Sequence, residues 1–261
     1  MLDFNYEERS LEEQIERTVQ KDGRGEGFLK SGHKIFTPKE GSNRFRILPK
    51  TWEGGSKHYG YDVWVHYNIG PRNSSYVCPK YMSNEPCPIC EELAKSTDKE
   101  YINTLKAKKK VLIWVIDREN ENEGPKLFAM ASTVDKNFVL QSIDEEDGKL
   151  LFIDHPVKGY DVAVTRTGTG RTTKWDGEKI SRTSKPLSDK QENIETWLQY
   201  IIDNPIPSLL VIKDYNYIKT AFYGTILPST DSKPKQIEEN KETVPGLDTD
   251  KINDIMSRIK K

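Results

Sequence analysis

The strongest strand pattern in the chain is Lys110-Val111-Leu112-Ile113-Trp114-Val115-Ile116-Asp117. Its six consecutive apolar residues fill both alternating sets of positions, which is typical of a strand at the centre of a sheet, where both faces are buried. Two further lysines, Lys108 and Lys109, precede it. The segment therefore predicts a central strand with a basic entrance.

Shorter strand patterns lie on both sides of this segment. Over residues 61–67 polar and apolar side chains alternate, which places Val63 and Val65 on the inner face and Trp64 and His66 on the outer face. Further strands are predicted over 44–48, 126–130, 161–166 and 171–175, and a helix over about 132–143. Short strands with Gly, Asn and Asp turns and inserted helices favour a mainly β fold with helical insertions (α+β), built as a small curled barrel.

One main domain with attachments at both ends is expected, because 261 residues with 34% hydrophobic content can bury one sizeable core. We expect a helix and a glycine-rich tether over 1–27, the core over 28–227, and a linker with an amphipathic helix over 228–261. Within the core, a helical region is predicted over about 188–224. No apolar run approaches the ~20 residues of a membrane-spanning helix, so we expect a cytoplasmic protein with no membrane partner.

The charges are balanced overall but not along the chain. Lysine and arginine number 40 and aspartate and glutamate 41, which gives a formal net charge of −1 and does not by itself indicate a nucleic-acid binder. Residues 1–29 carry a charge of −4, whereas 30–116 carry +7 and 155–190 carry +4. This distribution predicts a basic working face with acidic borders.

Three cysteines, Cys78, Cys87 and Cys90, lie within thirteen positions. Cys87 and Cys90 form a C-x2-C pattern, whose two thiolates can bind one metal ion, and Cys78 supplies a third ligand. Tetrahedral zinc needs a fourth, for which His66 is the first candidate, because its strand leads back toward Cys78, and His58 the alternative. We predict one structural Zn²⁺ in a subdomain over about 66–107. The other interpretation, three free thiols in a core, is disfavoured by the surrounding prolines and polar residues.

The sequence of this region also suggests two catalytic alternatives. The C-x2-C pattern also occurs in zinc deaminases, but their H-x-E pattern is absent, because Asn68 and Gly60 stand where the glutamate would follow the two histidines. The acidic residues from Asp117 to Glu123 could suggest a two-metal nuclease, but they crowd a strand exit, which favours a solvated acidic loop. A zinc ion with four protein ligands has no open position, so we expect no enzyme activity.

Aromatic residues are concentrated between residues 45 and 81, which hold eight of the chain's 25, and basic residues alternate with them. Aromatic platforms in a basic groove are typical of proteins that bind single-stranded nucleic acid. About half of these rings, Phe45 among them, are expected in the core, and for Trp64 both base stacking and packing beneath the zinc loop stay open. The candidate nucleic-acid contacts are Arg44, Arg46, Lys57, Tyr59, Trp64, Arg72, Lys110, Trp114, Arg166, Arg171 and Lys174.

In the order of these motifs, the chain resembles the phage single-stranded DNA-binding proteins related to the helix-destabilising protein of T-even phages. The resemblance covers about residues 28–190 and rests on the segments 44–49, 65–67, 115–118 and 159–162 together with the three cysteines. It implies an OB-fold with a structural zinc subdomain beside the DNA groove. It also implies His66, Cys78, Cys87 and Cys90 as the zinc ligands.

The resemblance leads to a functional expectation. The protein would coat and protect single-stranded DNA, without sequence preference, in replication, recombination and repair, and it would lie in the host cytoplasm if a phage encodes it. Its terminal helices would contact replication or recombination proteins, and copies could associate on DNA. The alternative is a zinc-stabilised phage adaptor that binds a protein, with an incidental basic face.

Overall fold

The computed structural model describes residues 27–143 and 150–224. The helices predicted within 1–27 and 228–261 lie almost entirely outside these residues. Among the described helices, none is long and apolar enough to cross a membrane.

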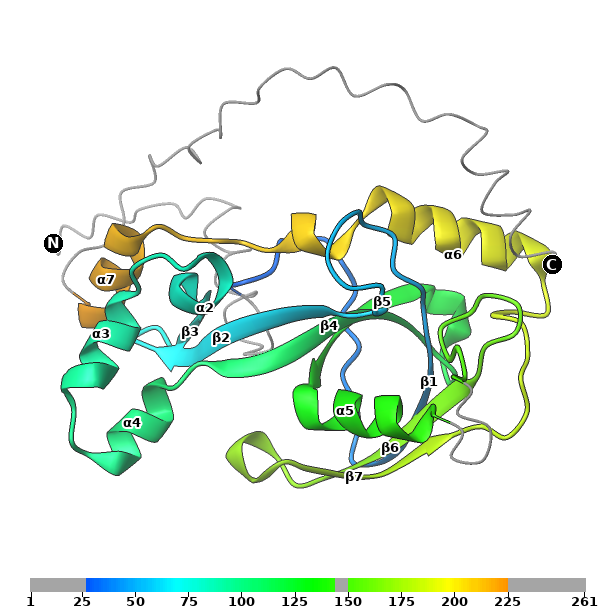
Figure 1. The fold of residues 1–261 in the computed structure, drawn as a ribbon, viewed down its shortest axis with the longest axis horizontal. Helices are drawn as coiled ribbons and strands as arrows, with labels where there is room; N and C mark the ends of the chain where they lie inside the picture. The colour runs from blue at the N-terminus through cyan, green and yellow to red at the C-terminus, as the bar shows by residue number, and fades with distance from the viewer. Residues whose placement is uncertain (1–26, 144–149, 225–261) are drawn as a thin grey trace, which may run out of the picture.

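The core of the fold is a seven-stranded antiparallel sheet centred on β4 (Figure 1). The strands are β1 (Gly41–Ile47), β2 (Tyr61–Ile69), β3 (Ser74–Val77), β4 (Lys108–Asp117), β5 (Pro125–Ala131), β6 (Asp161–Thr167) and β7 (Lys174–Ile180). Their order is β3-β2-β4-β1-β6-β7, with β5 on the other edge of β4. The first half of β4 pairs with β2 and its last three residues pair with β1. The predicted central strand is confirmed.

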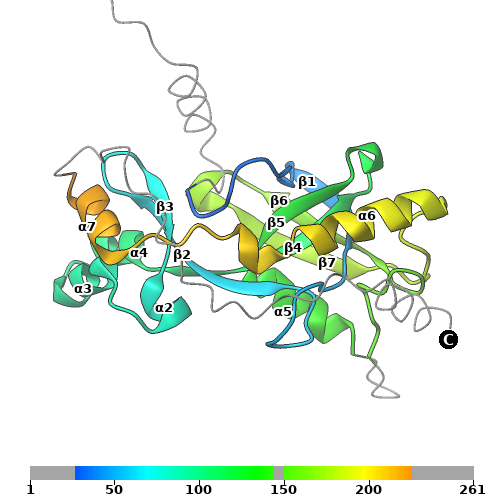
Figure 2. The same ribbon diagram turned by 90° about the horizontal axis from the view of Figure 1, so that it is seen from above.

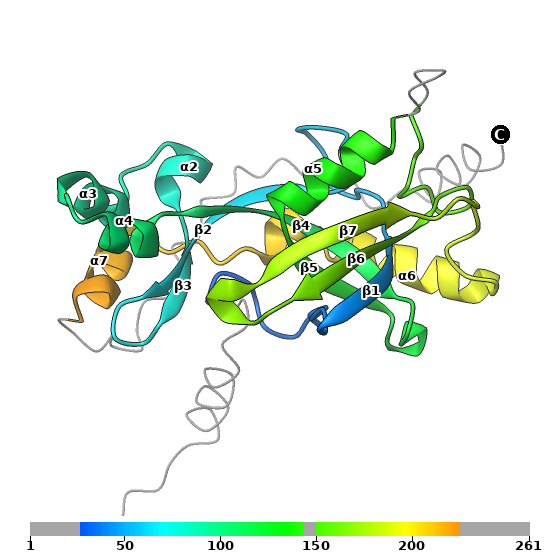
Figure 3. The same cartoon turned by 90° about the horizontal axis from the view of Figure 1, so that it is seen from below.

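The two faces of β4 enter two separate apolar clusters. Leu112, Trp114 and Ile116 pack in a cluster that includes residues of α6 (Gln191–Asp203) and of the short helix η3 (Ile206–Leu209). Val111, Ile113 and Val115 pack in a second cluster with side chains from β1, β6 and α5 (Ser132–Gln141). Figure 1 shows α6 and α5 on opposite sides of β4, and in the view from below in Figure 3 α5 lies in front of the sheet. Both faces of this strand are therefore buried, as its sequence requires.

For the sheet, the barrel expected from the sequence is not confirmed, and the bounds of one predicted strand are wrong. Within the described residues no pairing joins the ends of the strand path, so the structure shows a mixed fold with an open sheet rather than a closed barrel. The strand expected over 171–175 begins later, at Lys174, because Gly170–Thr172 forms a 3-10 turn (η2). Hydrogen bonds between Thr169 and Thr172 close this turn, and Gly168 before it has a positive φ of 73°.

A small helical subdomain projects from the end of β2 (Figure 2). It contains β3 and three short helices, α2 (Pro79–Ser83), α3 (Pro88–Lys95) and α4 (Lys99–Leu105). The helix α7 (Tyr215–Tyr223), more than 100 residues further along the chain, packs beside α3. The sequence predicts a helix at this position but not where it docks.

Candidate metal centre and aromatic surface

Four side chains converge where β2, α2 and α3 meet. His66 lies on β2, Cys78 immediately precedes α2, and Cys87 and Cys90 lie at the start of α3. The backbone N–H of Cys78 donates a 2.8 Å hydrogen bond to the carbonyl of Trp64, which holds Cys78 beside the histidine strand. One donor atom from each of the four residues lies within 4.8 Å of the others. The chain thus brings together the four residues predicted as ligands.

The spacing of these atoms fits a tetrahedral ion. Nε2 of His66 lies 3.5 Å from Sγ of Cys87 and 3.6 Å from Sγ of Cys90, and Sγ of Cys78 lies 3.6 Å from Sγ of Cys90. Zinc bonds of ~2.3 Å to sulfur and ~2.0 Å to nitrogen, at tetrahedral angles, would separate nitrogen from sulfur by ~3.5 Å and two sulfurs by ~3.8 Å. The cysteines form no disulfide. The residues therefore fit one metal ion.

The imidazole of His66 is oriented by a second hydrogen bond. Its Nδ1 donates to the carbonyl oxygen of Leu105 at 2.6 Å, which leaves the lone pair of Nε2 directed at the sulfurs. The sequence places His66 on an outer face, and this expectation is wrong, because the side chain is completely buried under the helical subdomain. The alternative ligand His58 lies elsewhere, with Nε2 3.4 Å from Asp135, and is not in the cluster.

The pKa values of His66, Cys87 and Cys90 are shifted because these side chains lie close together. Burial lowers the pKa of His66, but hydrogen bonds with the Cys78 and Cys87 thiols outweigh it, and the pKa is raised to about 9. Hydrogen bonds from Cys78 and Cys90 lower the pKa of the Cys87 thiol, whereas hydrogen bonds with Cys78 and Cys87 raise that of Cys90. The negative charge in the site is thus favoured on the sulfur of Cys87, and a bound cation would stabilise further thiolates while displacing protons. With four protein ligands it has no position for a substrate.

The acidic residues considered for a nuclease site form ion pairs instead. Asp117 and Glu123 both contact Nζ of Lys126, and Glu121 contacts Arg118. Glu119 contacts Lys39. Within the described residues, the only metal-ligating group found is the His/Cys cluster.

Three of the predicted nucleic-acid contacts are buried, and those predictions are wrong. Arg46 is completely buried, and Tyr59 and Trp114 are 6% and 1% exposed. The hydroxyl of Tyr59 donates to Asp135, and Nε1 of Trp114 donates to a backbone carbonyl at the end of α6. Both aromatic rings belong to the core clusters, so neither can stack on a base.

Arg46 belongs to a buried ion network beneath a loop. Its Nη2 donates to the carbonyls of His155 and Lys185, and its Nη1 lies 3.7 Å from Asp161, which also binds Arg118. Burial lowers the pKa of Arg46 to about 10, so the guanidinium stays charged at neutral pH. Alternation along β1 directs Arg46 outward, but distant loop segments cover this face, and the sequence pattern cannot show this.

The remaining candidates do not form one continuous surface. Arg44, Lys57, Arg72 and Lys174 are exposed, and Lys110 and Arg166 are half-buried. Residues paired across strands share a face. The register therefore puts Arg44 and Arg166 on opposite faces of the β1–β6 pair, and Lys110 on the face opposite Trp64. For Arg171 the structure gives the backbone position in η2 only.

Of the aromatic pair Trp64 and Tyr81, only Trp64 is among the predicted nucleic-acid contacts. Their rings stack with centroids 4.6 Å apart and planes 23° apart, and Tyr81 is 53% exposed. Lys109, paired with Trp64 across β2 and β4, lies on the same face. The sequence feature that could have indicated Tyr81 is the predicted ligand set. A metal shared by residues 66 and 78 brings the start of α2 back beside Trp64. Trp64 also packs against the apolar cluster that contains Cys78 and Cys87, as the alternative of packing beneath the metal-binding loop requires.

Comparison with known proteins adds no identification, since no protein-family model matches the chain and no curated protein matches its sequence.

Proposed function

We propose that this protein binds single-stranded DNA without sequence preference, coating and protecting it in replication, recombination and repair, and that one structural zinc ion supports the binding surface. The observation that carries the proposal is the Trp64–Tyr81 stack. A partly exposed aromatic pair offers a face to any base, and stacking does not depend on base identity. The exposed Lys80 beside Tyr81 supplies positive charge for phosphates, and Lys109 on the same face, whose Nζ lies 2.7 Å from Asp62, could exchange this carboxylate for a phosphate.

The metal part of the proposal follows from the donor set. Three thiolates and one imidazole in a closed, buried site are the ligands of structural zinc. The ion would join β2 to α2 and α3. Trp64 lies two residues before one ligand and Tyr81 three residues after another, so the ion would fix the distance between the two rings.

The curled sheet supports the proposal of an OB-type barrel. Side chains from β1, β4, β5 and β6 enclose the second apolar cluster. The segment around Ile35 forms a bridge with Leu127 on the outer edge of β5 and then leads into β1. This segment therefore links the outer edge of β5 to β1 along the chain, and OB-folds are partly open barrels.

The decisive experiment is a titration of the full chain with oligo-dT, monitored by tryptophan fluorescence. Tyr81→Ala keeps Trp64 as the reporter and should weaken binding by about 5- to 150-fold, because one stacked base contributes ~1–3 kcal/mol. Affinity should also fall with salt, by ~0.7 in log K for each phosphate contact per log unit of salt. Tyr101→Ala, a tyrosine 39% exposed on α4, is the matched control and should leave affinity unchanged. Unchanged binding by Tyr81→Ala, or equal affinity for duplex DNA, would contradict the proposal.

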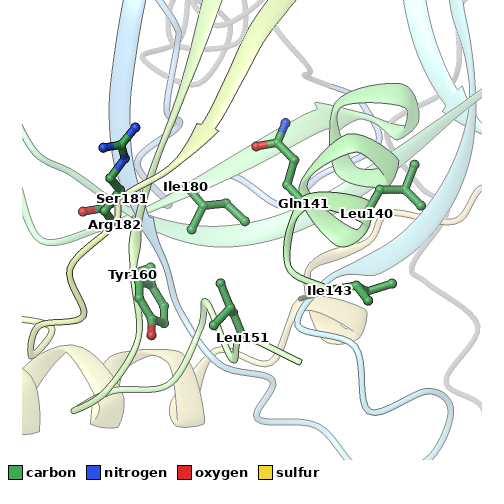
Figure 4. Close-up of a pocket in the computed structure, with 8 residues that line it drawn as sticks. All are labelled: Leu140, Gln141, Ile143, Leu151, Tyr160, Ile180, Ser181 and Arg182. Atoms are coloured by element: carbon green, nitrogen blue, oxygen red, sulfur yellow. The ribbon is translucent and has the colours of Figure 1, made fainter. Parts of the chain in front are cut away.

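A second candidate, the zinc-stabilised adaptor, is favoured by an apolar surface at the C-terminal end of α5. Leu140, Ile143, Leu150 and Phe152 are each at least 44% exposed there. An open pocket of about 580 Å³ lies beside them, with Leu151, Tyr160 and Ile180 on its walls (Figure 4). Exposed apolar groups beside a hollow are typical of protein-interaction sites. An adaptor predicts no quenching by oligo-dT at moderate salt, and Leu140→Ser would weaken the complex with its protein partner.

A further inference from the structure

Helix α7 packs beside the metal-ligand cluster, although it lies outside the segment of sequence that carries the four ligands. Ile218 of α7 is completely buried in the same apolar cluster as Cys78, Cys87 and Ile89. Ala221 and Phe222 pack against the edge of this cluster. Figures 1 and 2 both place α7 beside α3. Part of the wall of the metal site therefore comes from a helix more than 100 residues away in the chain.

On one side, α7 is bonded to the helix that carries two ligands. The hydroxyl of Tyr215 donates to Glu91 at 2.7 Å, and the hydroxyl of Tyr223 donates to Glu92 at 3.0 Å. These glutamates directly follow Cys90 on α3. The two hydrogen bonds hold α7 along the helix that presents Cys87 and Cys90.

On the other side, α7 touches the turn between β2 and β3, the strands that lead to His66 and Cys78. A Cβ atom on Gly70 would lie 2.2 Å from the carbonyl oxygen of Ala221, so the helix approaches this turn too closely for any other residue. Gly70 also has a positive φ of 67°. The end of α7 reaches Pro71 as well, since a Cβ on Gly224 would lie 2.9 Å from its ring.

We infer that α7 is a strap across the metal centre, joining the β2–β3 turn, whose strands lead to His66 and Cys78, to α3, which begins at Cys87 and carries Cys90, so that docking of α7 and retention of the metal are coupled. Ile218 and Tyr215 act as positioning residues through this packing and touch no metal. Coupling of this kind is reciprocal: a docked α7 slows metal release, and a bound metal stabilises docked α7. The inference rests on the metal part of the proposed function and not on DNA binding.

The first test is the rate at which zinc-loaded full-length protein releases its ion to an excess of chromogenic chelator. Ile218→Ala should release zinc at least tenfold faster than the wild type, because it removes the one side chain of α7 that is completely buried in the cluster. The matched control is Ile212→Ala, whose side chain is 55% exposed just before α7 and which should release zinc at the wild-type rate.

A second variant weakens the strap without touching the cluster. Oδ1 of Asp214 accepts a hydrogen bond from the N–H of Tyr217 at 2.9 Å and caps α7, and Asp214 itself is exposed. Asp214→Ala should accelerate release severalfold, since it removes the cap. Asp214→Asn should restore the wild-type rate, because asparagine caps a helix as well as aspartate. A loss of buried volume cannot explain this pair of results.

The reciprocal test is hydrogen exchange with and without zinc. Removing the ion should increase exchange at the amides of α7, while the amides of α6, which lie on the sheet, keep their protection. If α7 keeps its protection without metal, or if Ile218→Ala and Asp214→Ala both release zinc at the wild-type rate, α7 and the metal are not coupled and the inference is wrong. These results would leave the proposed metal site itself unaffected. If the wild type takes up no zinc, the metal part of the proposed function fails together with the strap.

Discussion

The sheet core and the metal subdomain are stabilised in different ways. The sheet is covered on both faces of β4 by apolar clusters of 16 and 14 buried residues, whereas the cluster of the metal subdomain contains eight, two of which are cysteines. The helices of the subdomain are five, eight and seven residues long. Helices of this length are not stable alone in water. The comparison indicates that apolar burial stabilises the sheet, whereas the subdomain has too small a core for this and would depend on a metal ion bound by its four ligands.

The largest expected effect is the removal of the metal, because structural zinc contributes roughly 10–16 kcal/mol of apparent binding free energy in small domains. Treatment with a chelator should abolish the protection of α3 and α4 amides in hydrogen exchange and leave β4 protected. His66→Ala should have the same effect, whereas His58→Ala should retain one zinc per chain. Equal loss of protection in β4 would show that the two regions do not differ in this way.

The next largest effect concerns the buried ion network at the end of the sheet. Asp161→Asn should lower the free energy of unfolding by about 3–5 kcal/mol, because it leaves the buried charges of Arg46 and Arg118 without their shared counterion. Urea unfolding of the zinc-loaded protein measures this loss. Zinc content should not change, and Asp203→Asn on the exposed surface of α6 serves as the control. A loss below 1 kcal/mol would mean that the network relaxes around the substitution.

Truncation in the sheet core should have a somewhat smaller effect. Ile113→Ala should lower the free energy of unfolding by about 2–5 kcal/mol, because its completely buried side chain leaves a cavity. Leu140→Ala, 56% exposed on α5, should change it by less than about 0.5 kcal/mol. Metal release should keep its wild-type rate in both variants. Faster release from Ile113→Ala would show that the two regions are not independent.

The smallest expected effect is the dependence of sheet stability on acid. Burial raises the pKa of Asp161, but hydrogen bonding to Lys185 and the charge of Arg118 outweigh it, so the pKa is lowered in the folded state. The pKa of Asp117 is lowered as well, because hydrogen bonds from Asn120 and Lys126 outweigh burial. A lowered folded pKa stabilises the protein above the unfolded value of ~3.9, and this contribution is lost as pH falls through the folded pKa.

Urea midpoints measured between pH 6 and pH 2 check this dependence. Stability should be flat near pH 6 and decrease below about pH 4, and Asp161→Asn should show a shallower decrease. Because acid also displaces metal from thiolates, the comparison is made on protein treated with chelator. An equally steep decrease in Asp161→Asn would assign the acid sensitivity to other carboxylates.

Short stretches of sequence determined two features of this protein by themselves. Residues 111–116 are apolar in both alternating sets, so the strand had to lie where both faces are covered, and β4 does. The three cysteines lie within 13 residues and follow from the few residue types that bind a tetrahedral ion, with His66 as the first candidate for the fourth ligand and His58 as the alternative. The structure brings His66 and not His58 to the cysteines. The positions of most strands along the chain follow from the same local alternation, whereas their order in the sheet does not.

Only the tertiary structure decided what covers each face. Alternation along β1 shows that Arg44 and Arg46 share a face, but a loop more than 100 residues away buries one and leaves the other exposed. The stack of Trp64 on Tyr81 and the docking of α7 on α3 likewise join segments that no local pattern connects. The physical reason is that side-chain periodicity records which residues lie on one side of an element, whereas burial depends on long-range packing that brings distant segments together.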